Sequence, residues 1–218
     1  MDNYNEEQFK IDFPKTEIGK KLLAETPTWM TVSYSPCNHS MVHSTPRETL
    51  LTLRVAPFFY ILKLLEKNPK QIADIGCGSN FFKNFIPEIY GIDPADHPNV
   101  DEVAFFYDGY SVENTDRFDC AMAINSLHFI SLTDITKQLN NFSNIIKPGG
   151  RGFVTLNAKR MIEVTKSSDQ VTMEQLSLYI KQQVDQALPN VLAYDDYIQT
   201  ELDEAMNGNI RVVFEKEK

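Results

Sequence analysis

The chain has 218 residues, of which 42% are hydrophobic, and a formal net charge of −9. This length and composition suit one α/β domain with a full hydrophobic core. The acidic balance, with no basic cluster longer than Lys20-Lys21, disfavours proteins that bind nucleic acid through its phosphates.

No stretch of the sequence is apolar over the length of a membrane span, and residues 1–10 are polar and acidic rather than signal-peptide-like. The three cysteines, Cys37, Cys77 and Cys120, have no metal-binding or redox spacing. An odd number of unpaired cysteines fits a reducing compartment. We therefore expect a cytoplasmic protein without a membrane partner.

The N-terminal segment, residues 1–44, mixes proline, aromatic and histidine residues without a clear period. We interpret it as a lid that covers a substrate site, ahead of a single domain over residues 45–218. Residues 45–48, Thr-Pro-Arg-Glu, combine an N-cap, a proline at the first helical position and a reciprocal glutamate. They predict that a helix begins there.

Cys37, His39 and His43 have a spacing that is open to interpretation as metal ligands. A structural or catalytic zinc site in this arrangement needs a further ligand, which the neighbouring sequence does not offer. A polar loop without a metal is the preferred interpretation.

Residues 71–80, Gln-Ile-Ala-Asp-Ile-Gly-Cys-Gly-Ser-Asn, predict a buried strand that runs directly into a glycine turn. Gly76 and Gly78 allow positive φ and let a ligand approach the backbone N–H groups closely. Asp74 lies inside the apolar strand, where a carboxylate is costly unless it holds loop amides or contacts a ligand. Taken alone, such a turn is also compatible with an ordinary strand-to-helix connection.

A second apolar strand over residues 89–92 ends in Asp93, at the distance that a βαβ unit requires. The helix between the two strands is expected to be short, over residues 80–86, because Pro87 stops it. A carboxylate at the end of the second strand can accept both hydroxyls of a ribose. With Pro94 directly after it, Asp93 is also compatible with a turn cap.

The following stretch predicts another strand, helix and strand. Residues 116–125 form an apolar run that suits a central strand covered on both faces. An amphipathic helix is predicted over residues 132–146. Lys-Pro-Gly-Gly at residues 147–150 ends it, and residues 152–156 form the next strand.

The C-terminal part adds a helix over residues 172–188 and a strand over residues 197–202. Asn207-Gly208 is a strong hairpin signal, and residues 210–214 form the returning strand. An antiparallel hairpin therefore closes a sheet that is otherwise parallel.

In this order, the motifs resemble class I S-adenosylmethionine-dependent methyltransferases, in particular the type 11-like group, over residues 47–214. The first motif of the family reads apolar-apolar-acidic-apolar-Gly-x-Gly-x-Gly. Asn80 replaces its third glycine here, and asparagine tolerates the left-handed conformation. A nicotinamide or flavin fingerprint would require glycine at Phe81. The resemblance implies an α/β fold with a Rossmann-like, doubly wound seven-stranded sheet, mostly parallel with a C-terminal antiparallel hairpin.

The resemblance also implies S-adenosyl-L-methionine as the cofactor. In the family, the acid that ends the second strand binds the ribose, so Asp93 inherits that role. Asp108, after a third strand expected over residues 102–106, lies where members bind the adenine amino group. The binding residues implied in this way are Asp74, Gly76, Cys77, Gly78, Asp93, Pro94, Asp108, Asn125 and Ser126.

His128 follows the predicted fourth strand in a Leu-His segment that resembles that of many small-molecule methyltransferases. Because histidine exchanges a proton near neutral pH, His128 is the candidate general base. A histidine that only packs or orients the loop is an equally good interpretation. His39 and His43 are weaker candidates, and we predict no metal.

The leading hypothesis is methyl transfer from S-adenosylmethionine to a small molecule or metabolite, with S-adenosylhomocysteine as the product. Enzymes that methylate exocyclic amines of nucleobases usually carry Asn/Asp/Ser-Pro-Pro-aromatic after the fourth strand, where residues 125–128 read Asn-Ser-Leu-His. The alternatives are a methyltransferase of a protein or RNA target and a catalytically silent donor-binding scaffold. Lys159, Arg160 and Lys166 could meet an acidic acceptor, although a solvated loop is the simpler interpretation.

Overall fold

The computed structural model describes residues 6–25, 29–34, 41–46, 57–127, 134–157, 173–196 and 209–218. The chain divides into two compact units, Met1–Lys63 and Leu64–Lys218. Residues 57–65 form a helix at the division between them.

Before the helix at residues 57–65, the described residues of the N-terminal unit form three short helical segments and a pair of antiparallel strands. The elements are α1 (Glu6–Asp12), the 3-10 helix η1 (Phe13–Lys15), α2 (Glu17–Glu25), β1 (Trp29–Tyr34) and β2 (Met41–Pro46). Thr16 caps α2, because its hydroxyl oxygen accepts the backbone N–H of Gly19 at 3.0 Å. Phe13 packs between two other rings of this unit: its ring centroid lies 4.8 Å from that of Phe9 and 5.0 Å from that of Phe58.

The expected helix start at Thr45-Pro46 is wrong. Both residues belong to β2, which pairs antiparallel with β1 so that Trp29 faces Pro46. Proline is tolerated at the end of a strand, where its missing N–H removes no ladder bond from the interior of the sheet.

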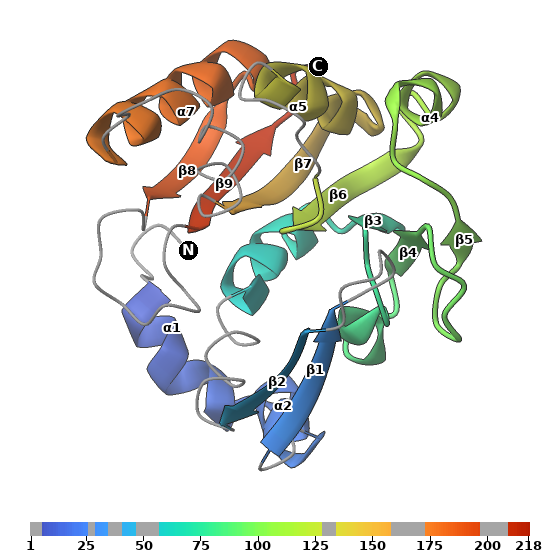
Figure 1. Ribbon diagram of the computed structural model, residues 1–218, viewed down its shortest axis with the longest axis vertical. Coiled ribbons are helices and arrows are strands. Elements are labelled where there is room, and N and C mark those ends of the chain that lie inside the picture. Colours follow the sequence, from blue (N-terminus) through green and yellow to red (C-terminus); the bar gives the residue numbers. More distant parts are fainter. Residues whose placement is uncertain are drawn as a thin grey trace. The chain divides into compact units, whose positions relative to one another are not determined.

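The C-terminal unit is built on one seven-stranded sheet in the order β5-β4-β3-β6-β7-β9-β8 (Figure 1). All neighbouring pairs are parallel except β7 with β9 and β9 with β8. The predicted α/β fold, a mostly parallel sheet closed by an antiparallel hairpin, is therefore confirmed. The strands are β3 (Ile72–Ile75), β4 (Ile89–Asp93), β5 (Glu102–Val103), β6 (Phe118–Ile124), β7 (Ile146–Asn157), β8 (Val191–Asp196) and β9 (Asn209–Glu215).

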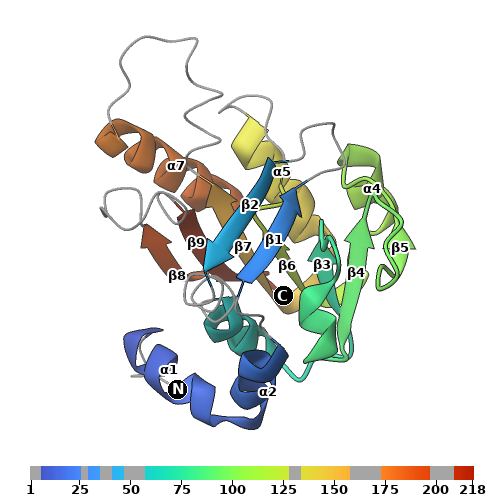
Figure 2. The same ribbon diagram turned by 60° about the horizontal axis from the view of Figure 1, so that its bottom comes forward.

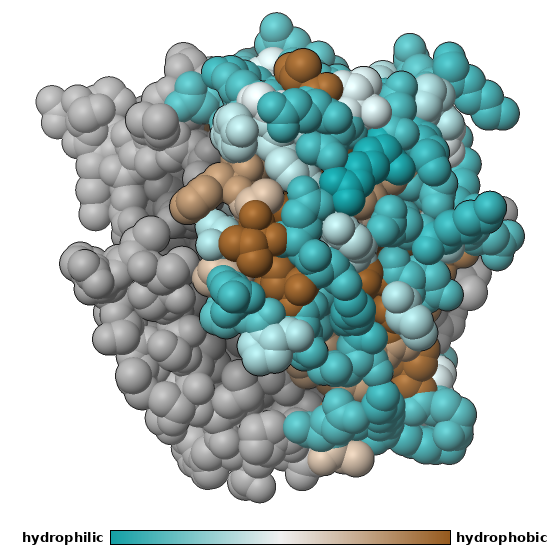
Figure 3. Space-filling view, turned by 90° about the vertical axis from the view of Figure 1, so that its right-hand side faces the viewer, coloured by the Kyte–Doolittle hydropathy of each residue, from teal (hydrophilic) through white to brown (hydrophobic). Residues whose placement is uncertain are grey.

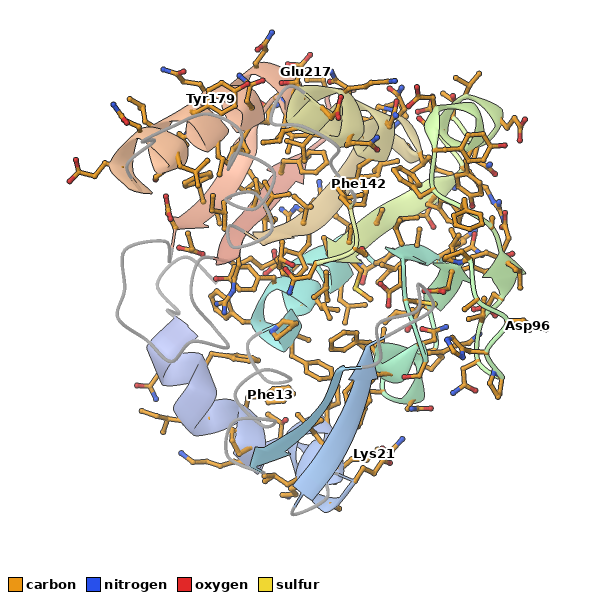
Figure 4. All side chains as sticks on the ribbon, in the orientation of Figure 1. Phe13, Lys21, Asp96, Phe142, Tyr179 and Glu217 are labelled. Carbon is orange, nitrogen blue, oxygen red and sulfur yellow. The ribbon has the colours of Figure 1, made fainter. Side chains whose placement is uncertain are left out.

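Helices cover one face of this sheet, as the turned view in Figure 2 shows for α5 and α7. The helical elements of the unit are η2 (Phe81–Asn84), α4 (Asp108–Glu113), α5 (Asp134–Asn144) and α7 (Met173–Ala187). The apolar faces of α4, α5 and α7 pack on residues of the central strands in one buried cluster. Phe142 of α5 exemplifies this packing, because it is fully buried and its ring lies 6.1 Å from that of Phe214 on β9 (Figure 4).

The predicted third strand over residues 102–106 is too long, since β5 ends at Val103. Only one further ladder bond follows, from Ala104 N–H to the Asp93 carbonyl at 3.1 Å. Beyond Asp93, the neighbouring strand continues into Pro94, which has no N–H to offer. The edge strand therefore loses its partner at that point.

Two other predicted boundaries need correction. The first crossover is the 3-10 helix η2 rather than an α-helix over residues 80–86. The last parallel strand starts at Ile146, so residues 147–150 interrupt β7 as a bulge in which Gly149 has φ +76°. The strand expected over residues 197–202 and the Asn207-Gly208 turn lie outside the described residues, and the described strand that pairs with β9 at the sheet edge is β8.

The edge of the sheet at β5 carries exposed apolar side chains. Val103, Phe105 and Tyr107 alternate along an extended segment, and Val112 projects from α4, each more than half exposed. Figure 3 shows apolar residues gathered on this side among hydrophilic ones. Among the described helices, none is long and apolar enough to cross a membrane.

Candidate donor-binding site

The glycine turn after β3 is held against the end of β4. Gly76 N–H donates to the Ile92 carbonyl at 2.7 Å, and Cys77 N–H reaches the same oxygen at 3.2 Å. Gly76 and Gly78 have φ of +66° and +54°, in the left-handed region that favours glycine. The strand and turn predicted from residues 71–80 are thus confirmed.

The two glycines have different surroundings. A Cβ added at Gly76 would overlap the side chain of Ser126, which follows β6. A Cβ added at Gly78 would meet nothing within 4 Å. Gly76 therefore serves packing between the ends of two strands, whereas Gly78 leaves open space beside its backbone.

Asp93, which ends β4, holds the turn with its carboxylate. One oxygen accepts the N–H of Gly78 at 2.8 Å, and the other accepts the N–H of Ala95 at 2.9 Å across Pro94. The second bond caps the turn, as the Asp93-Pro94 sequence also predicts. Since each carboxylate oxygen has about two acceptor directions, Asp93 can still accept further hydrogen bonds from a ligand.

Asp74 is buried in β3, and no donor among the described residues hydrogen-bonds its carboxylate. Burial, reinforced by the negative charge of Asp93, raises the pKa of Asp74 to about 8. Burial, with the charges of Asp74 and Asp93, also raises the pKa of the Cys77 thiol. β3 therefore contains a neutral acid at neutral pH, close to the Asp93 side chain that accepts two backbone N–H groups.

Asn80, at the position of the family's third glycine, has φ +50° and is fully buried. Its amide donates to the Asn99 carbonyl at 2.7 Å, while Asp101 accepts the N–H of Gly91 at 2.8 Å. A Cβ at Gly91 would overlap the Asn80 side chain. Asn80 therefore takes the left-handed conformation expected of it and ties the turn to the segment after β4.

The end of β6 meets the glycine turn. The Ser126 hydroxyl donates to the Ile75 carbonyl, the last of β3. Asn125 has φ +54°, and Thr155 of β7 accepts its backbone N–H at 2.7 Å. Asp74, Gly76, Gly78, Asp93 and Ser126 are thereby brought together at the carboxyl edge of the parallel strands, where open α/β sheets bind ligands.

Asp108 has partners of its own. It is exposed at the first turn of α4, where it pairs with Lys137 and accepts the side-chain amide of Asn141 at 2.7 Å. These hydrogen bonds, the one from Lys137 first, lower the pKa of Asp108. Both partners belong to α5, so this geometry gives Asp108 a role in joining two helices, and its predicted adenine contact stays a prediction.

Other predicted residues lie outside the described part of the chain, namely His128, Cys37, His39, Lys159, Arg160 and Lys166, and the side chain of His43 is likewise outside it. Among the described residues, no group of His, Cys, Asp and Glu is arranged to hold a metal ion. Sequence reasoning missed Thr155 and Asp101. Thr155 is a polar residue within an apolar strand, the same signal that identified Asp74.

The residues at the edge of the sheet fit an adenosyl donor. The open space beside Gly78 would accommodate a ligand that a side chain would exclude. The remaining acceptor directions of Asp93 suit ribose hydroxyls, and the buried Asp74 would pair with a positively charged group once it loses its proton. Donor binding by these residues nevertheless stays a prediction.

Comparison with known proteins supports the fold. No family model and no curated protein matches the sequence. The N-methyltransferase NodS from Bradyrhizobium japonicum WM9 has a similar structure, with a TM-score of 0.51 at 10% identity over 77% of this chain and 98% of NodS. The protein therefore has the class I methyltransferase fold.

Two further solved structures have lower scores. An S-adenosylmethionine-dependent methyltransferase from Clostridium acetobutylicum ATCC 824 has a TM-score of 0.47 at 16% identity, over 74% of this chain and 90% of that protein. The 16S rRNA (adenine(1408)-N(1))-methyltransferase from Catenulisporales acidiphilia has a TM-score of 0.46 at 11% identity, over 68% and 85%.

Proposed function

We propose that the protein is an S-adenosylmethionine-dependent methyltransferase that methylates a small molecule or metabolite. The observation that carries the proposal is the pairing of an open Gly78 backbone with the Asp93 carboxylate beneath it. Gly78 lies in the turn after the first strand of the sheet and Asp93 ends the second, at the edge where open α/β sheets bind their ligands.

The contribution of the protein to such a reaction is binding and orientation. S-adenosylmethionine supplies a methyl group that its sulfonium already activates. Gly76 and Ser126 fix the distance between the turn and the end of β6, and Asp93 holds the turn closed. Position and exclusion of water are the main requirements for in-line transfer. We assign His128 as the candidate base and residues 1–44 as the cover of the acceptor.

A small acceptor is favoured by charge and by sequence. The net charge of −9 disfavours a polyanionic target, and residues 125–128 lack the Pro-Pro turn used on nucleobase amines. A protein or RNA target and a silent donor-binding scaffold are the competing functions. We place the enzyme in the cytoplasm, on the basis of its cysteine usage.

The test is methyl transfer from S-adenosylmethionine labelled at its methyl group. The protein is incubated with separated small-molecule, RNA and protein fractions of a cell extract, and the label is followed into each fraction. We expect label in the small-molecule fraction, lost with Asp93→Ala and kept with Asp96→Asn. Asp96 is a matched control because it is an exposed aspartate on the loop between β4 and β5 (Figure 4).

Label in RNA or protein would assign the competing target class. Donor binding without label in any fraction would support the silent scaffold and overturn the enzyme proposal.

A further inference from the structure

Asn125 is the residue through which β6 leaves the sheet. It is exposed and has φ +54°, a conformation that asparagine tolerates better than most residues. The next residue, Ser126, lies against Gly76 and donates its hydroxyl to Ile75. Asn125 is therefore one residue away from direct contact with the glycine turn.

Thr155 fixes the orientation of the Asn125 side chain. Its hydroxyl oxygen accepts the backbone N–H of Asn125 at 2.7 Å, and the hydroxyl donates to Asn125 Oδ1 at 2.9 Å. A hydroxyl has a single hydrogen to donate, so this one is committed to the amide oxygen. The side-chain oxygen of Asn125 is thereby turned toward β7.

The amide nitrogen of Asn125 remains available on the other side. Nδ2 carries two N–H donors, and no acceptor among the described residues binds them. A side chain held by its oxygen, with free N–H groups beside a ligand-binding turn, is arranged to donate hydrogen bonds. An amine ligand would need the opposite arrangement, an acceptor oxygen directed at it.

We propose that Asn125 donates its side-chain N–H groups to a carboxylate, phenolate or carbonyl oxygen of the methyl acceptor, with Thr155 as the positioning residue, so that oxygen-bearing acceptors are preferred over amines. The inference rests on the proposed function. The same chemistry is also present in the α-carboxylate of the donor, and the test separates the two sources.

The first experiment measures donor affinity by calorimetry for wild type, Asn125→Asp, Thr155→Val and Thr155→Ser. The ligands are S-adenosylhomocysteine and 5′-methylthioadenosine, which lacks the amino-acid carboxylate. Asn125→Asp keeps the size of the side chain but directs an oxygen where the N–H groups were. If the donor carboxylate is the partner, this variant lowers the affinity for S-adenosylhomocysteine about tenfold or more and leaves the affinity for methylthioadenosine unchanged.

The second experiment titrates the protein loaded with S-adenosylhomocysteine with benzoate, phenol and benzylamine as acceptor probes. If the acceptor oxygen is the partner, wild type prefers benzoate or phenol to benzylamine, and Asn125→Asp removes that preference. Thr155→Val should reproduce the loss through misorientation, whereas Thr155→Ser keeps the hydroxyl and restores it. Thermal unfolding of each variant separates these effects from a loss of fold.

The inference is overturned if wild type shows no preference for oxygen probes, or if Asn125→Asp leaves that preference unchanged. It is also overturned if Asn125→Asp lowers only the affinity for S-adenosylhomocysteine, which would assign Asn125 to the donor carboxylate instead. Failure of wild type to bind S-adenosylhomocysteine is a different result. It would remove the proposed function, and the inference with it.

Discussion

Asp74→Asn should stabilise the protein increasingly as the pH rises. In the unfolded chain, this aspartate loses its proton near its ordinary pKa of 3.8, whereas the folded protein holds the proton up to a pKa of about 8. Between these values, the folded state binds the extra proton, so the contribution of Asp74 to stability falls as the pH rises. The amide does not ionise and removes this dependence.

The size of the effect follows from how steeply the free energy of unfolding changes with pH. One pH unit corresponds to about 1.4 kcal/mol for one proton. The free energy of unfolding of Asp74→Asn relative to wild type should therefore rise by about 2–3 kcal/mol between pH 5 and pH 7. For a protein of this size, that gain corresponds to roughly 5–10 °C in melting temperature.

Urea unfolding of both proteins at several pH values from 5 to 8 measures this difference directly. Asp96→Asn is the control, because it makes the same chemical change at an exposed position. The difference between variant and wild type is the quantity compared, so any constant offset from the new amide does not matter. A difference that stays constant over this range, or that shrinks with rising pH, would refute the reasoning about Asp74.

Three further predictions concern the turn and its surroundings. Gly78→Ala should lower the free energy of unfolding by only about 1–2 kcal/mol, because its backbone is left-handed, yet it should abolish donor binding by filling the open space. Gly76→Ala should lower the free energy of unfolding by about 3 kcal/mol or more, because the new methyl group also overlaps Ser126. Urea unfolding and calorimetry compare the two variants, and equal losses of stability would contradict the different roles given to Gly76 and Gly78. Binding of S-adenosylmethionine at pH 7 should release about 0.9 of a proton from Asp74, since a cation beside this carboxyl group lowers its pKa. Calorimetry in buffers of different ionisation enthalpy counts the released protons, and the Asp74→Asn variant should release none. Asp108→Asn should leave donor affinity within about twofold, because α5 already holds this carboxylate; a tenfold loss would instead establish the adenine contact.

Local sequence predicted the core of the fold well, because the central strands are buried on both faces. Residues 72–75 and 118–124 are short, mostly apolar runs with the length of a buried strand, and both form strands. Asn80 and its left-handed conformation could also be anticipated, since few residues other than glycine adopt it.

Boundaries at the edges depended on tertiary pairing and were predicted less well. β5 stops where Pro94 deprives it of a partner, which the apolar run beyond Val103 does not reveal. The bulge at residues 147–150 pairs with the C-terminal segment, since Gly149 N–H donates to the Lys216 carbonyl at 2.9 Å. A local pattern carries no information about such a distant partner.

The candidate site shows the same division. Asp74, Gly76, Gly78 and Asp93 stand next to one another in a continuous motif or at the end of an obvious strand. Thr155 could not be assigned a role in advance, because its function depends on the register of β7 against β6, which sets Ile124 opposite Thr155. That register follows from a bulge that the sequence does not predict.

Titration of the wild-type protein with S-adenosylhomocysteine, beside Asp93→Asn and Asp96→Asn, tests the central claim most directly. In Asp93→Asn, the side-chain amide would direct an N–H group at one of the two backbone N–H groups whose hydrogen bonds the carboxylate accepts. We predict one binding site in wild type and in Asp96→Asn, weakened about tenfold or more in Asp93→Asn. Absence of binding by wild type, or equal affinity in all three proteins, would contradict the placement of the donor at the glycine turn.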